Sequence, residues 1–429
     1  MESVTPVIPA ELNIFSNTKI QNAILGDQIV ACKPVNALTL PLSTLEFASS
    51  GSNETYRDLS QTFLRLKVCL RAEDGMVPIV DQEVACVNNL LYSLFQTLEV
   101  YLGGKLVCRE DYYGYKSYVE SLLNFSAEAA RTHLTSAMFY LDTPGEVLTA
   151  GDANEGFRKR KSLLAGGRSC ELYGRVRCGL FNQPLLLPQG LDLRVKFTFA
   201  PESFYMWGAE GADVLKLHIQ DASLYTRNVI LSPPLLLSHA RILAQTNAVY
   251  PMKRVECKAF TVPPGSRNIT LNSVSTGRLP SFLCCAMLEN STFNGNRHQN
   301  SFAFVHKSVT SVSIFVNSLE HKIGPMDFNS TNSTYAFAYY SLFASTGADS
   351  RPTPHMITPE MFSHGTFLVC KDLTPDASGN TGHSNIPNSG EVRIELTFAV
   401  AIETAVTCLV LLEYDATLEI DSSRNILIA

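Results

Sequence analysis

The sequence predicts a mostly β protein built from two β-sandwiches in tandem, and three observations support this prediction. Several segments alternate apolar and polar residues with a period of two, which is typical of half-buried strands. Helical periodicity is scarce and confined to one short region. A proline pair, Pro233-Pro234, interrupts the strand pattern near the midpoint of the 429-residue chain.

The alternation is clearest in residues 62–71, 191–199 and 392–398. In each segment apolar residues occupy every second position, and polar residues such as Arg65 and Lys67 occupy most of the others. Because successive side chains of a strand point to opposite faces of a sheet, each segment has one face suited to a core. Residues 409–420 are predicted to form one or two further strands.

A tight hairpin is predicted over residues 98–108. Apolar residues at positions 98, 100 and 102 lead into Gly103-Gly104, and residues 105–108 lead out again. A two-residue hairpin turn requires positive φ, which glycine adopts without a steric penalty. We therefore expect positive φ at both glycines.

Helices are predicted only as a short insertion in the first sandwich. Residues 115–123 carry apolar side chains at i, i+3, i+4, i+7 and i+8, the spacing of one helix face. A second short helix is expected to follow, with Ser126 as N-cap and Glu128 in its first turn, reaching about Leu134.

The proline pair defines the predicted domain boundary. Proline lacks the amide donor that a sheet ladder needs, so a strand should end at Pro233-Pro234, and strand patterning resumes after Tyr250-Pro251. We predict an N-terminal arm over residues 1–45, a first sandwich over 46–235 and a second over 236–429. Periodicity alone does not distinguish a jelly roll from another Greek-key sandwich.

Four long polar segments are predicted to be loops: residues 143–156, 290–300, 347–354 and 374–390. Loops of this length usually carry a function or lack fixed structure. In an assembling protein they would decorate the exposed surface or reach a neighbour.

The composition favours a protein that packs against neighbours. Charged residues make up 17% of the chain, against about 25% in a typical globular protein. The net charge of −6 argues against a protein built mainly to coat nucleic acid. The N-terminus has an early acid and two prolines, so we expect no signal peptide, and the most apolar stretch, 405–412, is too short to span a bilayer.

No catalytic motif is present in the sequence. Neither a nucleophile elbow, a phosphate-binding loop, a zinc-protease motif nor a dinucleotide-binding motif can be found. The histidines show no metal-ligand spacing; they are His133, His218, His239, His298, His306, His321, His355, His364 and His383. We therefore predict that the chain is not an enzyme and has no cofactor and no metal.

The eleven cysteines are scattered, and none forms a CxxC pair. We interpret them as reduced thiols in a core, where cysteine behaves as a small apolar residue. Cys284-Cys285 is the one adjacent pair. It could be a redox or metal site, but adjacent side chains of a strand point to opposite faces, which favours two buried core residues.

Two further segments allow alternative interpretations. The strongest charge run consists of Arg158, Lys159, Arg160 and Lys161. It could be a nuclear-import signal or a DNA-facing patch, and the competing interpretation is a solvated loop partly balanced by nearby acids. The aromatic cluster around Trp207 could be a binding platform, although a core edge or a subunit contact is favoured.

The order of short motifs resembles the major capsid proteins of Polintons (Mavericks) and adintoviruses. The resemblance covers nearly the whole chain. In the first half its segments are 11–15, 56–59, 98–107, 113–123, 154–160, 174–176 and 181–183. In the second half they are Tyr250-Pro251, Arg278-Leu279-Pro280, 290–295, 372–376 and 390–398.

This resemblance implies two jelly rolls side by side, each of about eight strands. It implies a homotrimeric, pseudo-hexameric capsomer that tiles an icosahedral virion shell around DNA. The expected partners are other copies of the chain, a penton or minor capsid protein and, weakly, the packaged DNA. Assembly is expected in the host cytoplasm or nucleus.

Two alternatives remain open at this point. One is a lectin-like jelly-roll protein that binds a sugar or a receptor. The other is a host gene that descends from a capsid gene. Stable trimers and larger shells would distinguish a capsid protein from a lectin, which would stay small.

Overall fold

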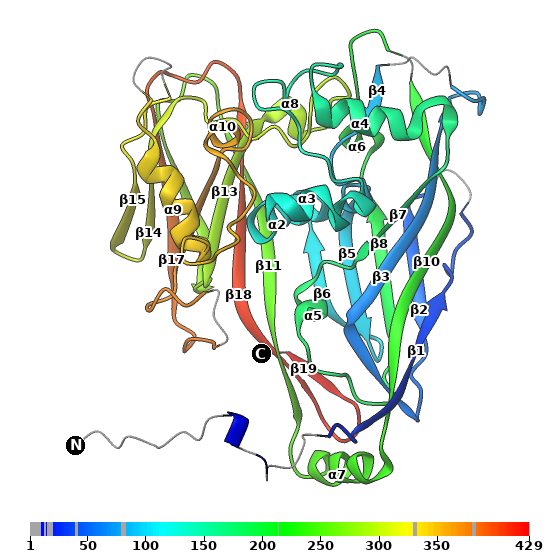
Figure 1. Ribbon diagram of the computed structural model, residues 1–429. Helices are drawn as coiled ribbons and strands as arrows, with labels where there is room; N and C mark the ends of the chain where they lie inside the picture. The colour runs from blue at the N-terminus through cyan, green and yellow to red at the C-terminus, as the bar shows by residue number, and fades with distance from the viewer. Residues whose placement is uncertain are drawn as a thin grey trace.

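The computed structural model describes residues 10–12, 14, 20–38, 42–78, 83–212, 214–328, 333–379 and 383–428. Strands make up 43% and helices 20% of the structure. Two β-sandwiches stand side by side, with their strands running along the same long axis (Figure 1). Buried side chains of both sandwiches belong to one continuous hydrophobic core.

The first sandwich consists of two facing antiparallel sheets. One has the strand order β1–β10–β3–β7, and the other has the order β2–β8–β5–β6. The strands are β1 Ile24–Cys32, β2 Thr44–Ser49, β3 Thr55–Ala72, β5 Phe95–Leu102, β6 Lys105–Asp111, β7 Cys170–Arg175, β8 Leu193–Phe199 and β10 Leu215–Leu231. A separate ribbon pairs β4 (Val84–Cys86) with β9 (Met206–Gly208).

The second sandwich repeats this arrangement. Its sheets have the orders β11–β18–β13–β16 and β12–β17–β14–β15, and β19 pairs with β18. The strands are β11 Ala248–Val262, β12 Asn268–Arg278, β13 Phe282–Glu289, β14 Val309–Val316, β15 Leu319–Ile323, β16 Leu368–Asp372, β17 Ser389–Phe398, β18 Val406–Ile420 and β19 Ile426–Ile428.

The two sandwiches share one topology. When the strands of each are numbered in chain order, leaving out β4, β9 and β19, both give the sheets 1–8–3–6 and 2–7–4–5. In this order successive strands repeatedly pass from one antiparallel sheet to the other, which is the topology of a jelly roll. The fold class predicted from the sequence, two tandem jelly rolls, is therefore confirmed.

The predicted alternation matches the strands. In β3, Leu64, Leu66 and Val68 are buried in the core, and Lys67 is exposed on the opposite face. The predicted hairpin joins β5 to β6, with φ of 51° at Gly103 and 79° at Gly104. Residues 409–420 form part of a single long strand, β18.

Helices occupy more of the chain than the sequence predicted. The expected insertion is present as α2 (Tyr113–Asn124) and α3 (Ala127–Arg131), with the Ser126 side chain accepting a hydrogen bond from the Ala129 amide. The structure adds α1 Leu90–Ser93, α4 Glu155–Leu164, α5 Gly179–Asn182, α6 Glu202–Tyr205, α7 Pro233–Leu243, α8 Asn290–Phe293, α9 Ala336–Thr346 and α10 Pro359–Ser363. Thus α4 and α8 take up parts of two predicted loops, and residues 380–382 of a third lie outside the described residues.

Two of these helices, α4 and α9, have no apolar stripe with helical spacing in their sequences. The buried face of α4 includes Arg160, so a charged residue stands where periodicity analysis expects an apolar one. The sequence of α9, AFAYYSLFAST, is apolar on most sides and shows no clear 3.6-residue pattern. The prediction that helix is confined to residues 115–134 was wrong for these reasons.

The predicted arm over residues 1–45 was too long. β1 lies within it and pairs with β10 from Ile24 to Cys32, and β2 begins at Thr44. β1 is an edge strand without a fully buried face, so it shows no alternation. Residues 1–9, 13, 15–19 and 39–41 lie outside the described residues.

The proline pair marks the connection between the jelly rolls. β10 ends at Leu231, and Pro233-Pro234 begin α7, where a fixed φ suits the first helical turn. The boundary predicted after residue 235 thus falls inside α7. β11 then starts at Ala248, and Pro251 lies in this edge strand opposite Thr417.

Candidate assembly surfaces and the seam between the jelly rolls

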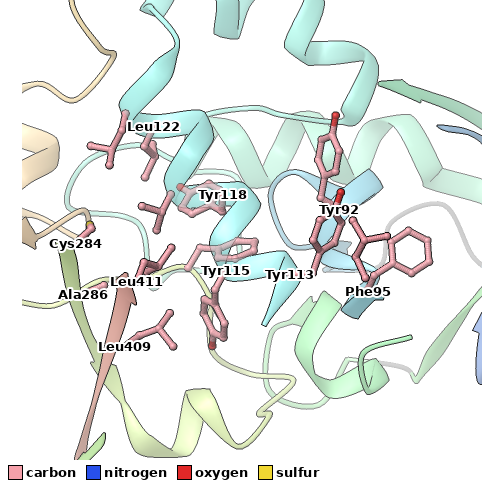
Figure 2. Close-up of a cluster of buried hydrophobic side chains, with 14 of the residues drawn as sticks. Tyr92, Phe95, Tyr113, Tyr115, Tyr118, Leu122, Cys284, Ala286, Leu409 and Leu411 are labelled. Atoms are coloured by element: carbon pink, nitrogen blue, oxygen red, sulfur yellow. The ribbon is translucent and has the colours of Figure 1, made fainter. Parts of the chain in front are cut away.

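Helix α2 fills the seam between the two jelly rolls. It inserts aromatic side chains from the first jelly roll against residues of the second. Tyr118 stacks on Phe302 with ring centroids 4.1 Å apart, and Tyr115 meets the same ring edge-on at 5.8 Å. On its other side α2 faces β13 and β18, including Cys284 and Leu411 (Figure 2). Large apolar side chains buried in this way make the seam a core rather than a loose domain contact.

A buried charge cluster lies on the same helix. Lys116 is 1% exposed, and its ammonium contacts Glu110 at 2.9 Å, Glu120 at 2.7 Å and the Arg177 carbonyl at 3.2 Å. Burial alone would lower the pKa of Lys116, but Glu110 and Glu120 outweigh it and hold that pKa well above its usual value. Lys116 therefore remains a cation inside the seam.

The facing sheet of the second jelly roll carries its own charge group. Lys253 on β11 contacts Asp415 at 2.6 Å and Glu413 at 3.3 Å, both on β18. Burial raises the pKa of Glu413, and Lys253 opposes that effect. The sequence analysis missed the charged residues Lys116 and Glu413, and it found the apolar face of α2 without its contact to the second jelly roll, because nothing in the local spacing links the two halves of the chain.

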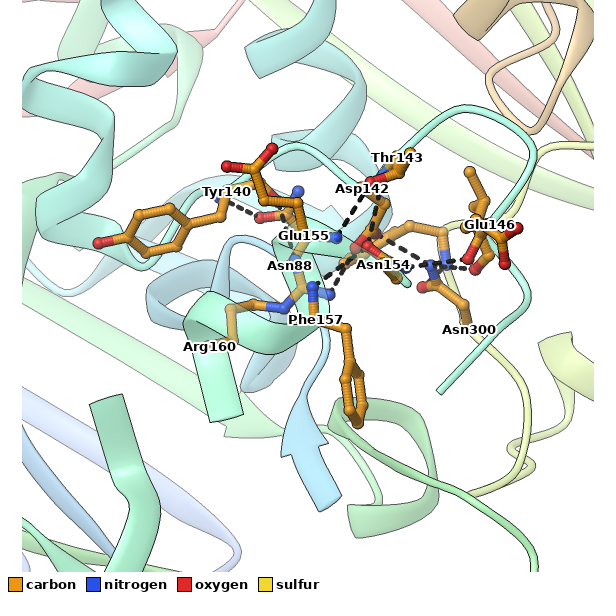
Figure 3. Close-up of polar contacts among 12 residues, drawn as sticks. Asn88, Tyr140, Asp142, Thr143, Glu146, Asn154, Glu155, Phe157, Arg160 and Asn300 are labelled. Atoms are coloured by element: carbon orange, nitrogen blue, oxygen red, sulfur yellow. Dashed lines mark hydrogen bonds and ion pairs between the residues drawn. The ribbon is translucent and has the colours of Figure 1, made fainter. Parts of the chain in front are cut away.

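The predicted basic patch does not form as one surface. Arg160 is fully buried, and its guanidinium contacts Asp142 Oδ1 at 2.7 Å, the Tyr140 carbonyl at 2.8 Å and the Cys86 carbonyl at 2.9 Å (Figure 3). Asn300, which belongs to the second jelly roll, donates to the other Asp142 oxygen at 3.1 Å. Arg160 therefore joins the two halves structurally and cannot contact nucleic acid or an import receptor.

The other three members of the run have different surroundings. Lys161 is mostly covered and contacts Glu83 at 2.7 Å, and Lys159 contacts Glu155 at 2.7 Å one helical turn away. Arg158 and Lys159 are exposed. A nucleic-acid or import role thus stays a prediction for these two residues alone.

The other sequence candidates are core residues. Trp207 is fully buried and meets Phe157 edge-on at 4.9 Å, so it is not an open aromatic platform. Cys284 and Cys285 are buried in β13, and Cys284 stands opposite Cys370 in the sheet. Both of these placements agree with the core interpretation.

One group of possible metal ligands does come together. Among the described residues, Cys108, Glu110 and Cys178 bring their ligand atoms within 4.8 Å of one another, and all three are buried. Their separation in sequence hid this group from a search by spacing.

Exposed apolar side chains mark three surfaces. A groove of about 440 Å³ lies beside α7 and is lined by Tyr56, Leu231, Leu235, His239, Ile242 and Tyr250 among others. On α9, Phe337 is 59% and Tyr340 61% exposed.

None of the helices within the described ranges has the length and apolar composition needed to cross a membrane.

The third surface with an exposed apolar side chain is the outer face of the sheet β1–β10–β3–β7. There Tyr173 stacks on Phe63 at 5.1 Å and lies 6.1 Å from the Tyr225 ring. Tyr173 is exposed and the other two rings are half-buried, and aromatic residues that reach the surface in this way are typical of surfaces that become buried on association.

The fold is that of the double jelly-roll major capsid proteins of large DNA viruses and virophages. The chain is similar to a protein in the structure of the Sputnik virophage, with a TM-score of 0.67 and 12% identity, covering 99% of this chain and 93% of that one. It is similar to the mavirus major capsid protein, with a TM-score of 0.56 and 10% identity, covering 100% and 96%. The PBCV-1 virus capsid gives a TM-score of 0.58 and 11% identity, covering 97% and 99%.

Sequence comparison adds a relative without an assigned activity. An uncharacterised protein of Caenorhabditis elegans is 23% identical over 395 residues, which is 89% of this chain and 92% of that protein. No family model matches the chain. At identities this low, the likeness to the solved structures shows the fold alone.

Proposed function

We propose that this protein is a major capsid protein that assembles as a homotrimer with pseudo-hexameric shape. The single observation that carries the proposal is the internal repeat: two jelly rolls of identical topology, joined by a helix-filled seam. If the same kind of contact that joins the two jelly rolls within one chain also forms between copies, the copies can close into a ring.

The repeat suggests which surfaces meet. In each jelly roll the connection between the fifth and sixth strands carries helices: α2, α3 and α4 in the first, α9 and α10 in the second. Within the chain, α2 packs on the sheet β11–β18–β13–β16. By analogy, α9 of one copy would pack on the sheet β1–β10–β3–β7 of the next.

Both of these surfaces carry suitable side chains. α9 exposes Phe337 and Tyr340, and the receiving sheet exposes Tyr173, which is in contact with the half-buried rings of Phe63 and Tyr225. The contact is heterologous, since different surfaces of the two copies meet. If each seam turns the chain by the same angle, three copies supply the six jelly rolls of a closed ring.

In this proposal the trimers tile an icosahedral shell around DNA, and the protein is located in the virion. Assembly takes place in the host cytoplasm or nucleus, with a penton or minor capsid protein at positions that a pseudo-hexamer does not fill. Catalysis has no part in this function. Arg158 and Lys159 are the candidates for weak contact with DNA or for nuclear import.

The test is sedimentation of the full-length protein in physiological salt, combined with negative-stain microscopy. We expect trimers that bury well over ~800 Å² per partner, in the range of permanent assemblies. A double variant, Phe337→Asp with Tyr340→Asp, should sediment as a folded monomer. Val400→Asp changes an equally exposed apolar residue outside the proposed contact and should leave the trimer intact.

A wild-type protein that remains a folded monomer across the micromolar range would contradict the proposal and favour a lectin-like binding protein. Trimers that persist in the double variant would leave the capsid role in place but exclude α9 as the contact.

A further inference from the structure

Two buried thiols lie in close contact beside the seam. Cys108 on β6 and Cys178 just before α5 place their sulfur atoms 2.8 Å apart. Even two carbon atoms reach their optimal contact only at about 3.5–4.0 Å, and sulfur is larger. Forming a disulfide of about 2.05 Å would require the sulfurs to move together by less than about 1 Å.

We propose that Cys108 and Cys178 form a disulfide when the protein leaves a reducing compartment, and that this cross-link fastens the seam. The proposal concerns the single chain, so it does not depend on assembly or on the capsid role.

The location makes this pair different from the other thiol neighbours. Cys284 and Cys370 already face each other across paired strands, so a bond between them would join segments that the sheet holds together. Cys108 lies on an edge strand, and no ladder connects that strand to Cys178. A bond here would close a loop of about 70 residues that contains all of α2, the helix of the seam.

Cys178 is also adjacent to a tight contact with the second jelly roll. At the next residue, Gly179, an added Cβ would lie 1.6 Å from the Lys253 carbonyl oxygen on β11, so only glycine fits. A cross-link from Cys178 to β6 would therefore hold the start of α5 against the sheet of the second jelly roll that contains β11. Loss of this anchor would loosen the seam where the two backbones meet.

The pair lies beside the buried ion pair of the seam. Cys108 Sγ lies 3.7 Å from Glu110 Oε1, and Lys116 neutralises the same carboxylate from 2.9 Å. Burial raises the pKa of the Cys178 thiol well above its usual value, so exchange in the closed subunit is slow and takes place in transient openings.

The reaction is thiol–disulfide exchange with a small oxidised disulfide such as oxidised glutathione. One cysteine thiolate attacks the glutathione disulfide and releases one glutathione thiolate. The second cysteine then attacks the mixed disulfide and releases the other. The two protein protons end on the two glutathione molecules, so two thiols are oxidised and one glutathione disulfide is reduced.

The experiment equilibrates the full-length chain with oxidised or reduced glutathione at a urea concentration just below unfolding. Free thiols are then counted by alkylation, and linked peptides are identified by mass spectrometry. We expect two of the eleven thiols to be lost in the wild type, with Cys108 and Cys178 in one linked peptide. The thermal midpoint should rise by about 5 °C or more.

Matched variants give the controls. On switching from the reduced to the oxidised buffer, Cys178→Ala should lose no thiols and should show no rise in its thermal midpoint. Cys86→Ala removes an equally buried thiol, whose sulfur lies 3.7 Å from the thioether sulfur of Met206, and should behave as wild type. The wild-type peptide map decides the matter even if a variant fails to fold.

Three results would overturn the proposal. All eleven thiols could remain free at equilibrium, or the linked peptide could contain another pair such as Cys284 and Cys370. The purified protein could also hold stoichiometric zinc that is released only when Cys108 or Cys178 is replaced, which would make the group with Glu110 a metal site instead.

Discussion

The two jelly rolls have the same strand order but use the same connection differently. In the first, the helix that follows the fifth strand, α2, is enclosed between the sandwiches and buries most of its residues. In the second, the corresponding helix, α9, buries Ala338 and Leu342 but leaves Phe337 and Tyr340 in solvent. Topology determines where an insertion can leave the sandwich, and the neighbouring surface determines whether it becomes core or interface.

The jelly rolls also differ in the polar groups that they bury. The first encloses complete ion pairs, such as Arg160 with Asp142. The second contains the half-buried His306 and the buried His355, which stack on Phe328 at 4.1 Å and Phe343 at 3.8 Å. Each of these histidines accepts a backbone N–H at Nδ1, so each is held as a neutral ring.

The largest expected effect tests the ion pair of the first jelly roll. Arg160→Ala leaves Asp142 buried without its charge partner and should lower the free energy of unfolding by about 3–5 kcal/mol. Lys159→Ala, one residue away, removes an exposed pair and should change it by less than about 1 kcal/mol. Urea unfolding followed by far-UV circular dichroism measures both. Similar changes in the free energy of unfolding for the two variants would mean that the buried ion pair of Arg160 stabilises the fold no more than an exposed one.

The second prediction concerns the loss of stability in acid, which should arise from the two histidines of the second jelly roll. Burial lowers the pKa of His306 and of His355 to about 4, below the value of about 6.5 that each has in an unfolded chain. The unfolded state therefore takes up protons first as the pH falls. The stability due to the neutral rings is complete above pH 6.5 and is lost between pH 6.5 and 4, by about 2 kcal/mol for each histidine.

Thermal unfolding at pH 7.0 and 4.5 checks this prediction. The double variant His306→Gln with His355→Gln should show a smaller difference between the two pH values than the wild type. His218→Gln, on β10 of the first jelly roll, is the matched control. An unchanged pH dependence in the double variant would exclude these two histidines as the acid-sensitive groups.

The smallest effect concerns a turn of the first jelly roll. Gly104→Val places a β-branched side chain at a φ of 79° and should destabilise the β5–β6 hairpin by about 1 kcal/mol or more. Open space surrounds this position, so the effect reports backbone strain rather than a clash with neighbours. A thermal midpoint identical to that of the wild type would show that the turn relaxes to another conformation.

The sequence predicted the strands that have one buried face and one polar face. β3, β8 and β17 alternate because each separates core from surface, whereas the edge strand β1 has no such contrast and was taken for an arm. α4 and α9 were missed because their buried faces do not follow an apolar stripe. Local pattern carries little information about elements whose environment is set by distant segments.

The candidate site illustrates the same limit. Four adjacent basic residues suggested one patch, but a helix turns about 100° per residue, so Arg158 and Arg160 point to different sides of α4. Cys108 and Cys178 are brought together only by folding of the whole insertion between them. No spacing rule could pair them, and the sequence analysis interpreted them, with the other cysteines, as reduced core thiols.

The covalent link through α7 has a consequence for how a shell could begin. Because one chain contains both jelly rolls, their mutual contact forms without loss of the translational freedom that two separate molecules would give up on binding. In the proposed ring every second seam is formed in this way before any encounter between subunits. Only the remaining seams depend on protein concentration, so α7 halves the number of bimolecular contacts that nucleation has to make.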